Sequence, residues 1–233
     1  LPAEPAPPPK PNSMDIKKLA CVQDSNAFWH ADFESEGPGW ENIGVAEGAT
    51  SLCGYKGYWY LTTEGNTLWR HEVGGEHNVW YPLGTAEDIV GIAAANDTLY
   101  VAQSSTNNIW KCPIDAPCEW EHVGTCENAV DLAVDEATNT AYCVTSADTV
   151  WKASCDDFAW EAIGTAENPA AMDFNNGTLY LAQKETNTLW SCDPSGGECA
   201  WEAIGVAENC IALGAHGHDE AEEAAPSDIH PLG

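Results

Sequence analysis

The sequence has very few basic residues. It carries 8 Lys and Arg against 37 Asp and Glu, and its formal net charge is −29 over 233 residues. A surface this acidic repels the phosphate backbone of nucleic acids, so we expect no nucleic-acid partner. Cations, basic proteins and neutral ligands are all compatible with it.

Long apolar runs and the common catalytic signatures are also missing. No stretch approaches the 18 apolar residues of a transmembrane helix, and no window has sustained helical periodicity. The sequence contains no GxSxG or HExxH motif, no phosphate-binding loop and no dinucleotide fingerprint. We therefore expect a protein that is not an enzyme and has no transmembrane segment.

Cysteine, in contrast, is abundant. Ten Cys in this chain indicate an oxidising compartment, and the absence of any CxxC pair argues against a structural zinc site. The sequence starts at Leu1 and Pro2 rather than at Met, as a processed secreted protein would. Together these features predict a secreted, extracellular protein.

Two series of Trp repeat along the chain. One recurs every 40 or 41 residues, at Trp40, Trp80, Trp120, Trp160 and Trp201. The other runs in parallel, at Trp29, Trp69, Trp110, Trp151 and Trp190. Each unit holds four short segments rich in β-branched and aromatic residues, for example 171–174, 178–182, 188–192 and 201–204. This pattern predicts an all-β, five-bladed β-propeller with four-stranded blades of about 40 residues.

The two ends of the chain complete the fifth blade. Segment 211–216 matches an innermost strand, and segments 19–23, 26–31 and 40–43 match the three outer strands. Pairing the two ends would close the ring and leave no loose edge. We expect a Pro-rich arm over 1–18, the propeller over 19–216, and a disordered, acidic, His-containing tail over 217–233.

The cysteines are assigned from this strand pattern. The predicted disulfides are Cys112–Cys118, Cys192–Cys199, Cys126–Cys143 and Cys21–Cys210. The first two close short loops within a blade, and the last would lock the two chain ends together. Cys53 and Cys155 fall on different blades and are left without an assigned partner.

An acidic residue recurs in the turn that enters each innermost strand. The series is Glu47, Glu87, Glu127, Glu167 and Glu208, each followed by Gly, Asp or Asn. In a propeller these turns surround one mouth of the central channel, where the carboxylates form either a ligand-binding rim or a ring for a hard cation such as Ca²⁺. Ordinary turn chemistry is the alternative, because Gly, Asp and Asn tolerate left-handed backbone and Glu can bond locally to the backbone.

The turn between the second and third strands carries further polar residues, among them Asn107 and Asn187. Amide groups beside exposed aromatic rings suit sugars, which need hydrogen-bond partners and a flat apolar platform. Turn chemistry is again the alternative.

The C-terminal region and two sequons are the remaining candidate sites. His216, His218 and Asp219 have spacing that suits weak Cu²⁺ or Zn²⁺ binding, and a solvated tail is the alternative. Asn96 and Asn176 each start an N-glycosylation sequon in an inner hairpin turn, which we expect to be exposed.

The repeated unit resembles that of the tachylectin-2 type of five-bladed propeller lectins. The residues that carry the resemblance are Trp160, Ile163 and Gly164, then Leu179 and Tyr180, then Leu189 and Trp190, with their copies over roughly 19–216. The resemblance implies binding of amino sugars at a repeated site in each blade.

Three functions follow from these observations. The first is a secreted, multivalent, carbohydrate-binding protein whose partners are glycans or glycan-coated surfaces. The alternative is an extracellular metal-binding protein that holds Ca, Cu or Zn at the Glu turns or the His tail. A propeller hydrolase or lactonase with Ca²⁺ at the channel mouth is third, and the repetition of Glu from blade to blade weighs against its single asymmetric site.

Overall fold

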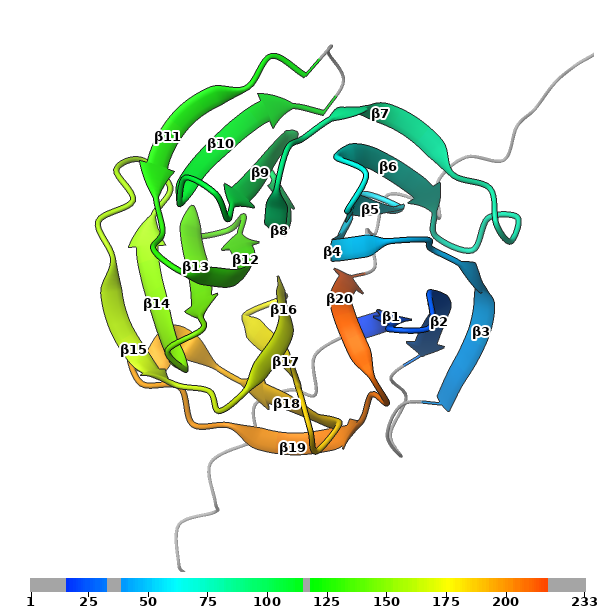
Figure 1. Cartoon of the computed structure of the whole chain (residues 1–233). Helices are drawn as coiled ribbons and strands as arrows, with labels where there is room; N and C mark the ends of the chain where they lie inside the picture. The colour runs from blue at the N-terminus through cyan, green and yellow to red at the C-terminus, as the bar shows by residue number, and fades with distance from the viewer. Residues whose placement is uncertain (1–15, 33–38, 115–117, 218–233) are drawn as a thin grey trace, which may run out of the picture.

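The computed structural model describes residues 16–32, 39–114 and 118–217. Over these ranges the chain forms five antiparallel sheets of four strands each, arranged as blades around a central axis (Figure 1). The only helical element is a short 3₁₀ turn, Pro194–Gly196, in the part of the chain that is described. The predicted all-β, five-bladed propeller is therefore confirmed.

The strands follow one another from the axis outward in each blade. Blade 1 contains β4 (Ala49–Tyr55), β5 (Tyr58–Thr63), β6 (Thr67–Glu72) and β7 (Tyr81–Thr85). Blade 2 contains β8 (Ile89–Ala95), β9 (Thr98–Gln103), β10 (Asn108–Pro113) and β11 (Glu121–Thr125). Blade 3 contains β12 (Ala129–Asp135), β13 (Thr140–Thr145), β14 (Thr149–Ser154) and β15 (Glu161–Thr165). Blade 4 contains β16 (Pro169–Asn175), β17 (Thr178–Gln183), β18 (Thr188–Cys192) and β19 (Glu202–Val206).

The closing blade joins the two ends of the chain. It contains β20 (Cys210–Gly217), β1 (Ile16–Gln23), β2 (Ala27–Asp32) and β3 (Gly39–Val45), in that order from the axis. Strand β20 pairs antiparallel with β1, with Leu19 opposite Ala215. The predicted closure is confirmed, and the red end of the chain lies beside the blue end in Figure 1.

The inner hairpins turn where the sequence carries residues that accept positive φ. Asn176 and Gly177 have φ of 48° and 79°, and Lys56 and Gly57 have φ of 43° and 78°. Two consecutive positive φ values define the turn whose twist matches that of paired strands. The sequon residues Asn96 and Asn176 both lie in such turns and are exposed, as predicted.

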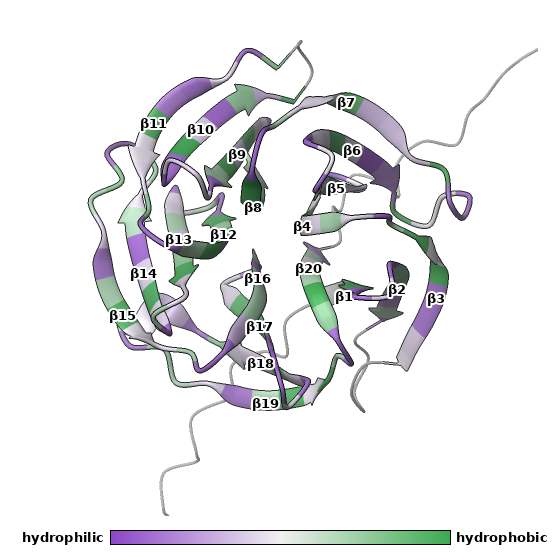
Figure 2. Cartoon of the chain, viewed as in Figure 1, coloured by the Kyte–Doolittle hydropathy of each residue, from purple (hydrophilic) through white to green (hydrophobic). Residues whose placement is uncertain are grey.

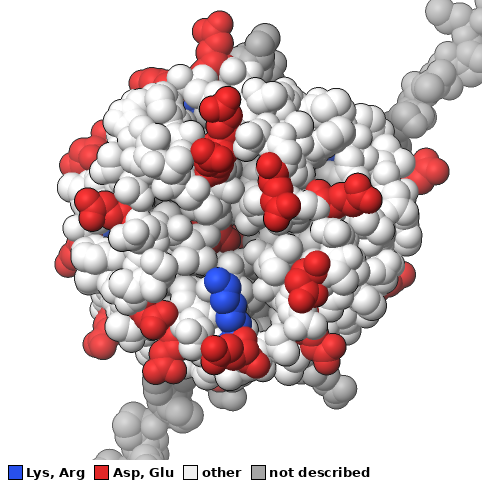
Figure 3. Space-filling model, in the orientation of Figure 1, with Lys and Arg blue, Asp and Glu red and all other residues white. Residues whose placement is uncertain are grey.

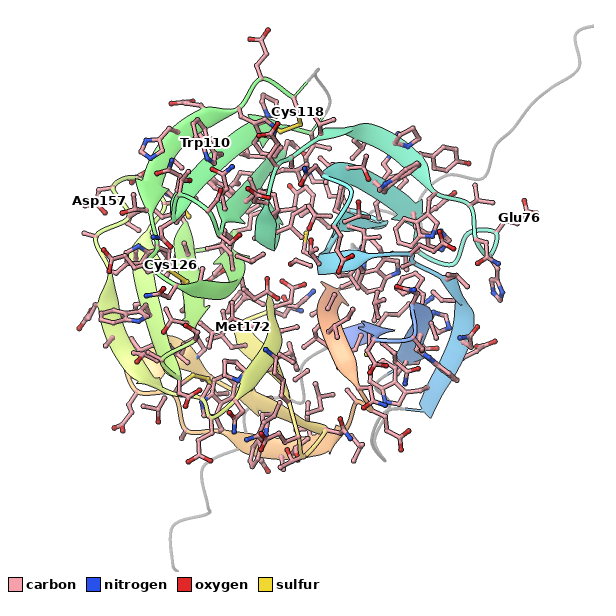
Figure 4. All side chains as sticks on the ribbon, in the orientation of Figure 1. Glu76, Trp110, Cys118, Cys126, Asp157 and Met172 are labelled. Atoms are coloured by element: carbon pink, nitrogen blue, oxygen red, sulfur yellow. A yellow bond between two sulfur atoms is a disulfide. The ribbon has the colours of Figure 1, made fainter. Side chains whose placement is uncertain are left out.

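The core is divided into five apolar clusters, each shared by two neighbouring blades. The inner strands contribute a matching set of fully buried side chains to these clusters: Leu52, Ile92, Leu132, Met172 and Leu213. Met172 lies near the centre of the ring in Figure 4, and apolar residues follow the inner strands in Figure 2. Burying one such side chain stabilises the fold by about 1.5–3 kcal/mol, so blade-to-blade packing holds the ring together.

Three of the four predicted disulfides are present: Cys112–Cys118, Cys126–Cys143 and Cys192–Cys199. In Figure 4 Cys118 lies at the outer edge of the ring.

The fourth predicted bridge, Cys21–Cys210, is not formed. Cys21 lies opposite Leu213 and Cys210 lies opposite Gln23, so the two cysteines are offset by two residues along β1. Both cysteines remain buried thiols, as does Cys53, while Cys155 is a partly exposed thiol. The prediction failed because it assumed that Cys21 and Cys210 are directly opposed, whereas the register of β1 with β20 gives them different partners.

Trp59 breaks the repeat at the junction between blade 1 and the closing blade. It is fully buried, and small residues make room for it at Gly54 and Gly214. A Cβ atom on Gly214 would lie 3.0 Å from Cζ3 of Trp59 and 3.1 Å from Cγ of Leu52. The junction that closes the ring is thus tightly packed around one indole.

We expect Gly214→Ala to destabilise the protein by about 1–3 kcal/mol, since the added methyl group overpacks this junction. Urea unfolding followed by tryptophan fluorescence measures the change. Gly196→Ala is the matched control, because a Cβ atom there meets nothing within 4 Å. Equal stability of the two variants would contradict the packing argument.

Candidate functional site

The five glutamates predicted from the repeat lie in the turns that connect one blade to the next. All five are exposed: Glu47, Glu87, Glu127, Glu167 and Glu208. The residue after each has a positive φ between 48° and 62°, at Gly48, Asp88, Asn128, Asn168 and Asn209. The turns therefore repeat in conformation as well as in sequence, and each presents a carboxylate to solvent on the same face of the ring.

An Asn or Asp side chain holds each of these turns in place. The residues are Asn26, Asn66, Asn107, Asp148 and Asn187, all with φ between 58° and 66°. Each Oδ1 accepts a hydrogen bond of 2.9–3.1 Å from the backbone N–H that follows the glutamate in the next turn. Each backbone carbonyl accepts a second bond from the same turn. The side-chain oxygens of Asn107 and Asn187 are thus engaged within the protein, and turn chemistry accounts for both residues.

The outer Trp series joins neighbouring blades. Each indole Nε1–H donates to a backbone carbonyl at the end of the preceding blade, over 2.6–3.0 Å. Trp201, for example, donates to the carbonyl of Thr165, directly before the turn that carries Glu167. The indole rings are half-buried, so each fixes the junction between two blades and still leaves part of its surface to solvent.

The inner Trp series lies beside these junctions, and Gln or Thr side chains orient its rings. The Nε1–H groups of Trp29, Trp110 and Trp190 donate to Gln Oε1 atoms, and that of Trp69 donates to Thr67 Oγ1. Two of these Gln residues also donate through Nε2 to the carbonyl of the turn glutamate, Gln23 to Glu208 and Gln103 to Glu87. Trp110 lies on β10 in the outer part of its blade in Figure 4.

These elements together line a small pocket between adjacent blades. In blade 4 it has a volume of about 190 Å³ and is lined by Trp190, Trp201, Gln183, Glu167 and the end of blade 3 at Thr165. The same residue types recur at each junction, except that Thr63 and Thr145 replace Gln in blades 1 and 3. A ligand at such a junction would meet indole surface and an exposed carboxylate.

The charge of this surface is overwhelmingly negative. Figure 3 shows acidic side chains spread over the whole visible face, with few basic ones among them. Of the basic residues that follow the inner Trp series, Lys111 pairs with Glu121 at 3.5 Å and Lys152 with Glu161 at 3.7 Å. These pairs are exposed, and pairs of this kind contribute about 0–1 kcal/mol each.

Of the three ligands predicted for a C-terminal metal site, only His216 lies among the described residues. This residue lies in β20, nearly buried, where its Nε2 accepts a hydrogen bond of 2.7 Å from the N–H of Gly57. Its ring also packs edge-on against Trp59 at 5.7 Å between ring centroids. His218 and Asp219 lie outside the described residues. Within the described ranges, no group of three or more His, Cys, Asp and Glu is arranged to hold a metal ion.

Two buried carboxylates were missed by the sequence analysis. Asp131 accepts hydrogen bonds from Ser51 Oγ, Leu132 N and Met172 N at 2.8–2.9 Å. These contacts reach blades 1 and 4 from blade 3, so the carboxylate ties three inner strands together across the axis.

Asp173 makes a similar set of contacts nearer the other end of the channel. It accepts from Phe174 N and Ala215 N at 2.8 Å and from Gly54 N at 3.3 Å. Inner strands are the open edges of the blades, and an unpaired buried N–H is costly. A sequence signal existed, because Asp131 replaces the small residues of the other inner strands: Ser51, Gly91, Ala171 and Ala212.

Burial governs the ionisation of both groups. It raises the pKa of Asp131 to about 8, although hydrogen bonds from Met172, Leu132 and Ser51 act in the opposite direction. Burial also raises the pKa of Asp173 well above its usual range, and the nearby charge of Asp131 adds to the shift. The channel is therefore crossed by two carboxyl groups that hold protons more tightly than exposed ones do.

Comparisons with known proteins identify the architecture alone. No family model and no curated protein matches the sequence. Among solved structures, a chain of a nidogen/laminin complex is similar over 85% of this chain and 97% of its own, with a TM-score of 0.58 and 10% identity. A chain of U3-55K is similar over 67% of this chain and 51% of its own, with a TM-score of 0.47 and 13% identity.

The first of these similarities defines the class of fold, a β-propeller, in agreement with the five blades. The resemblance to tachylectin-2-type lectins rests on the repeat pattern. The three disulfides are compatible with an extracellular location. None of the described helical segments is long and apolar enough to cross a membrane.

Substitutions at Asn187 test whether its role is structural. We expect Asn187→Ala to cost about 1–2 kcal/mol of stability, since it removes the hydrogen bond to Asn209 and places Ala in left-handed backbone. Asn187→Asp is the matched control, because Asp148 fills the same position in blade 3. Thermal unfolding compares the two, and the structural assignment fails if both variants are equally stable.

Stability should fall as the pH rises through the neutral range. The unfolded chain releases the Asp131 proton near its ordinary pKa of about 4, whereas the folded protein retains it up to about pH 8. The contribution of Asp131 to the free energy of unfolding is therefore fully present below about pH 4 and is lost as the pH rises to about 8.

Urea unfolding at about pH 5 and at about pH 8 measures this loss. The free energy of unfolding of the unaltered protein should be lower at about pH 8 than at about pH 5. We expect Asp131→Asn to reduce this difference in free energy by more than about 1.4 kcal/mol, the equivalent of one pKa unit. Asp24→Asn, at an exposed turn, is the control and should leave the pH dependence unchanged. An unaltered pH dependence in Asp131→Asn would show that this carboxyl group is not the cause.

Proposed function

We propose that the protein is a secreted, multivalent, carbohydrate-binding protein that takes one sugar unit at each junction between blades. The observation that carries the proposal is the repetition of two half-buried Trp rings and an exposed Glu at all five junctions. A pyranose presents an apolar face that packs on an aromatic ring and hydroxyl groups that donate to a carboxylate. The blade 4 pocket, at about 190 Å³, is suited to one such unit.

The rigid framework of each junction favours weak binding repeated many times. The indole N–H groups, the Gln side chains and the Asn or Asp oxygens are engaged in internal hydrogen bonds, so the rings are held in position before a ligand arrives. Five junctions with similar residues around the same axis can engage several sugars on one surface, and the overall avidity then exceeds that of each site. Preorganisation lowers the entropic cost of each contact.

The two alternatives have less support. Metal binding at the Glu turns lacks converging ligands, since the described residues contain no cluster of metal-ligating side chains. A hydrolase needs a single asymmetric site, and the junction pockets repeat around the ring. We therefore propose that this face binds ligands without converting them.

A glycan array with the intact protein, with and without EDTA, tests this function. We expect binding that survives EDTA. A variant with Ala at the five turn glutamates, Glu47, Glu87, Glu127, Glu167 and Glu208, should lose at least tenfold in apparent affinity. The matched control has Ala at five other exposed glutamates, Glu41, Glu72, Glu121, Glu161 and Glu202, and the same change in net charge.

The control variant should bind as the unaltered protein does. If binding disappears in EDTA, a metal at the turns becomes the mechanism. If no glycan binds above background in either condition, the carbohydrate proposal is wrong.

A further inference from the structure

The opposite mouth of the channel forms a cavity much larger than the junction pockets. Its volume is about 950 Å³, within the range of small-molecule sites. The ends of the inner strands and the hairpin turns that follow them line it, at 54–56, 94, 134–138, 174–177 and 216–217. All five blades therefore contribute to one enclosure on the axis.

The repeat of the sequence breaks down at this mouth. The last residue of the inner strand, or its equivalent in β20, is different in every blade: Tyr55, Ala95, Asp135, Asn175 and His216. The following position also varies, with Lys56, Glu136 and Gly217 in three blades and Asn in the other two, at Asn96 and Asn176. Residues that maintain blade packing repeat, as the buried Leu, Ile and Met of the inner strands do. Side chains that surround a single ligand on a pseudo-symmetry axis have no reason to repeat.

The lining combines apolar walls with polar groups of several kinds. Ala94, Val134, Pro194 and the stacked rings of Tyr142 and Phe174, 5.3 Å apart, supply the apolar part. The polar part comprises carboxylates, amides and the imidazole of His216. Such a mixture, apolar walls with a few convergent polar groups, is typical of sites for small organic ligands.

The charges that face the cavity identify the class of ligand. Both lysines on its lining have acidic partners of their own, Lys56 with Asp97 at 2.6 Å and Lys152 with Glu161 at 3.7 Å. Three further carboxylates line the cavity, Asp135, Glu136 and Asp193. The cavity is therefore left with an excess of negative charge.

Asp135, Asp193 and Tyr142 all line the cavity. Burial raises the pKa of Tyr142 to about 12, and the negative charges of Asp135 and Asp193 contribute to that rise. An ammonium group in the cavity would be attracted by the carboxylates of the lining, and the apolar part of the same ligand would lie against the cavity wall.

We propose that this cavity is a second ligand site, one per chain, for a small organic cation with an amine on an apolar body. It is distinct from the junction pockets in position, symmetry and ligand chemistry. Its carboxylates select the charge of the ligand, and the wall formed by Val134, Phe174 and Pro194 contacts the apolar body. The site does not depend on carbohydrate binding at the junctions.

Isothermal titration calorimetry with two probes of matched shape tests the proposal. Tyramine carries the ammonium group, and 4-ethylphenol has the same ring without it. We expect tyramine to bind with a stoichiometry of one per chain and at least tenfold more tightly than 4-ethylphenol. Asp193→Asn should weaken tyramine binding at least fivefold, and the amide retains the acceptor for Ser195 N that caps the 3₁₀ turn.

Two further variants keep the test decisive. Glu136→Gln, which retains an acceptor for Tyr55 and Asn96, should also weaken tyramine binding if Asp193→Asn does not fold. Glu167→Gln, in a junction pocket, should leave it unchanged. Absence of tyramine binding, equal affinity for both probes, or a stoichiometry near five that depends on Glu167 would overturn the proposal. None of these outcomes bears on the glycan array, so the two functions succeed or fail separately.

Discussion

The structure depends on the way each blade is fastened to the next. A four-stranded sheet has two apolar faces, and neither is buried until a neighbouring blade covers it. The five shared clusters supply this burial, and the hydrogen bonds at each junction fix the angle between blades. An outer Trp donates one bond to the preceding blade, as Trp201 does to Thr165, and an Asn or Asp oxygen accepts the other from a backbone N–H of the following turn. Because the bonds recur at every junction, an equal angle is set five times and the ring closes.

The sequence was sufficient for the architecture because the same constraint repeats. The Trp residues spaced by 40 or 41 positions each form a hydrogen bond between two blades, so their spacing equals the length of a blade. The incomplete blades at the two ends predict the pairing seen between β1 and β20. Features that depend on local register were not accessible. The register of β1 against β20 places Cys21 opposite Leu213 rather than Cys210, and no sequence pattern indicates this offset. The five glutamates lie in exposed turns, as the repeat predicted. For Asn107 and Asn187, residue type alone could not show whether the side chain binds the backbone, as it does, or a ligand.

The buried carboxylates were missed for a different reason. The sequence repeat reveals what the blades share, whereas Asp131 and Asp173 occur where the blades differ. In a ring of identical blades, each inner edge would present unpaired N–H groups to the channel. Asp131 and Ser51 instead accept hydrogen bonds from N–H groups of neighbouring inner strands. Asp173 does the same at a position two residues later in its inner strand. An acid is suited to this task because its two oxygens accept several bonds, which a single amide oxygen cannot match in all directions.

The buried carboxyl groups of Asp131 and Asp173 also separate the two faces of the molecule. On one face the junction turns repeat, and repetition suits a ligand that is itself repeated on a surface. On the other face the strand ends diverge, and divergence suits one asymmetric ligand on the axis. Asp131 and Asp173 lie between them and accept hydrogen bonds from backbone N–H groups of four blades and from the hydroxyl group of Ser51. Because the folded protein is more stable when these carboxyl groups are protonated, their ionisation would loosen the inner strands that support both faces.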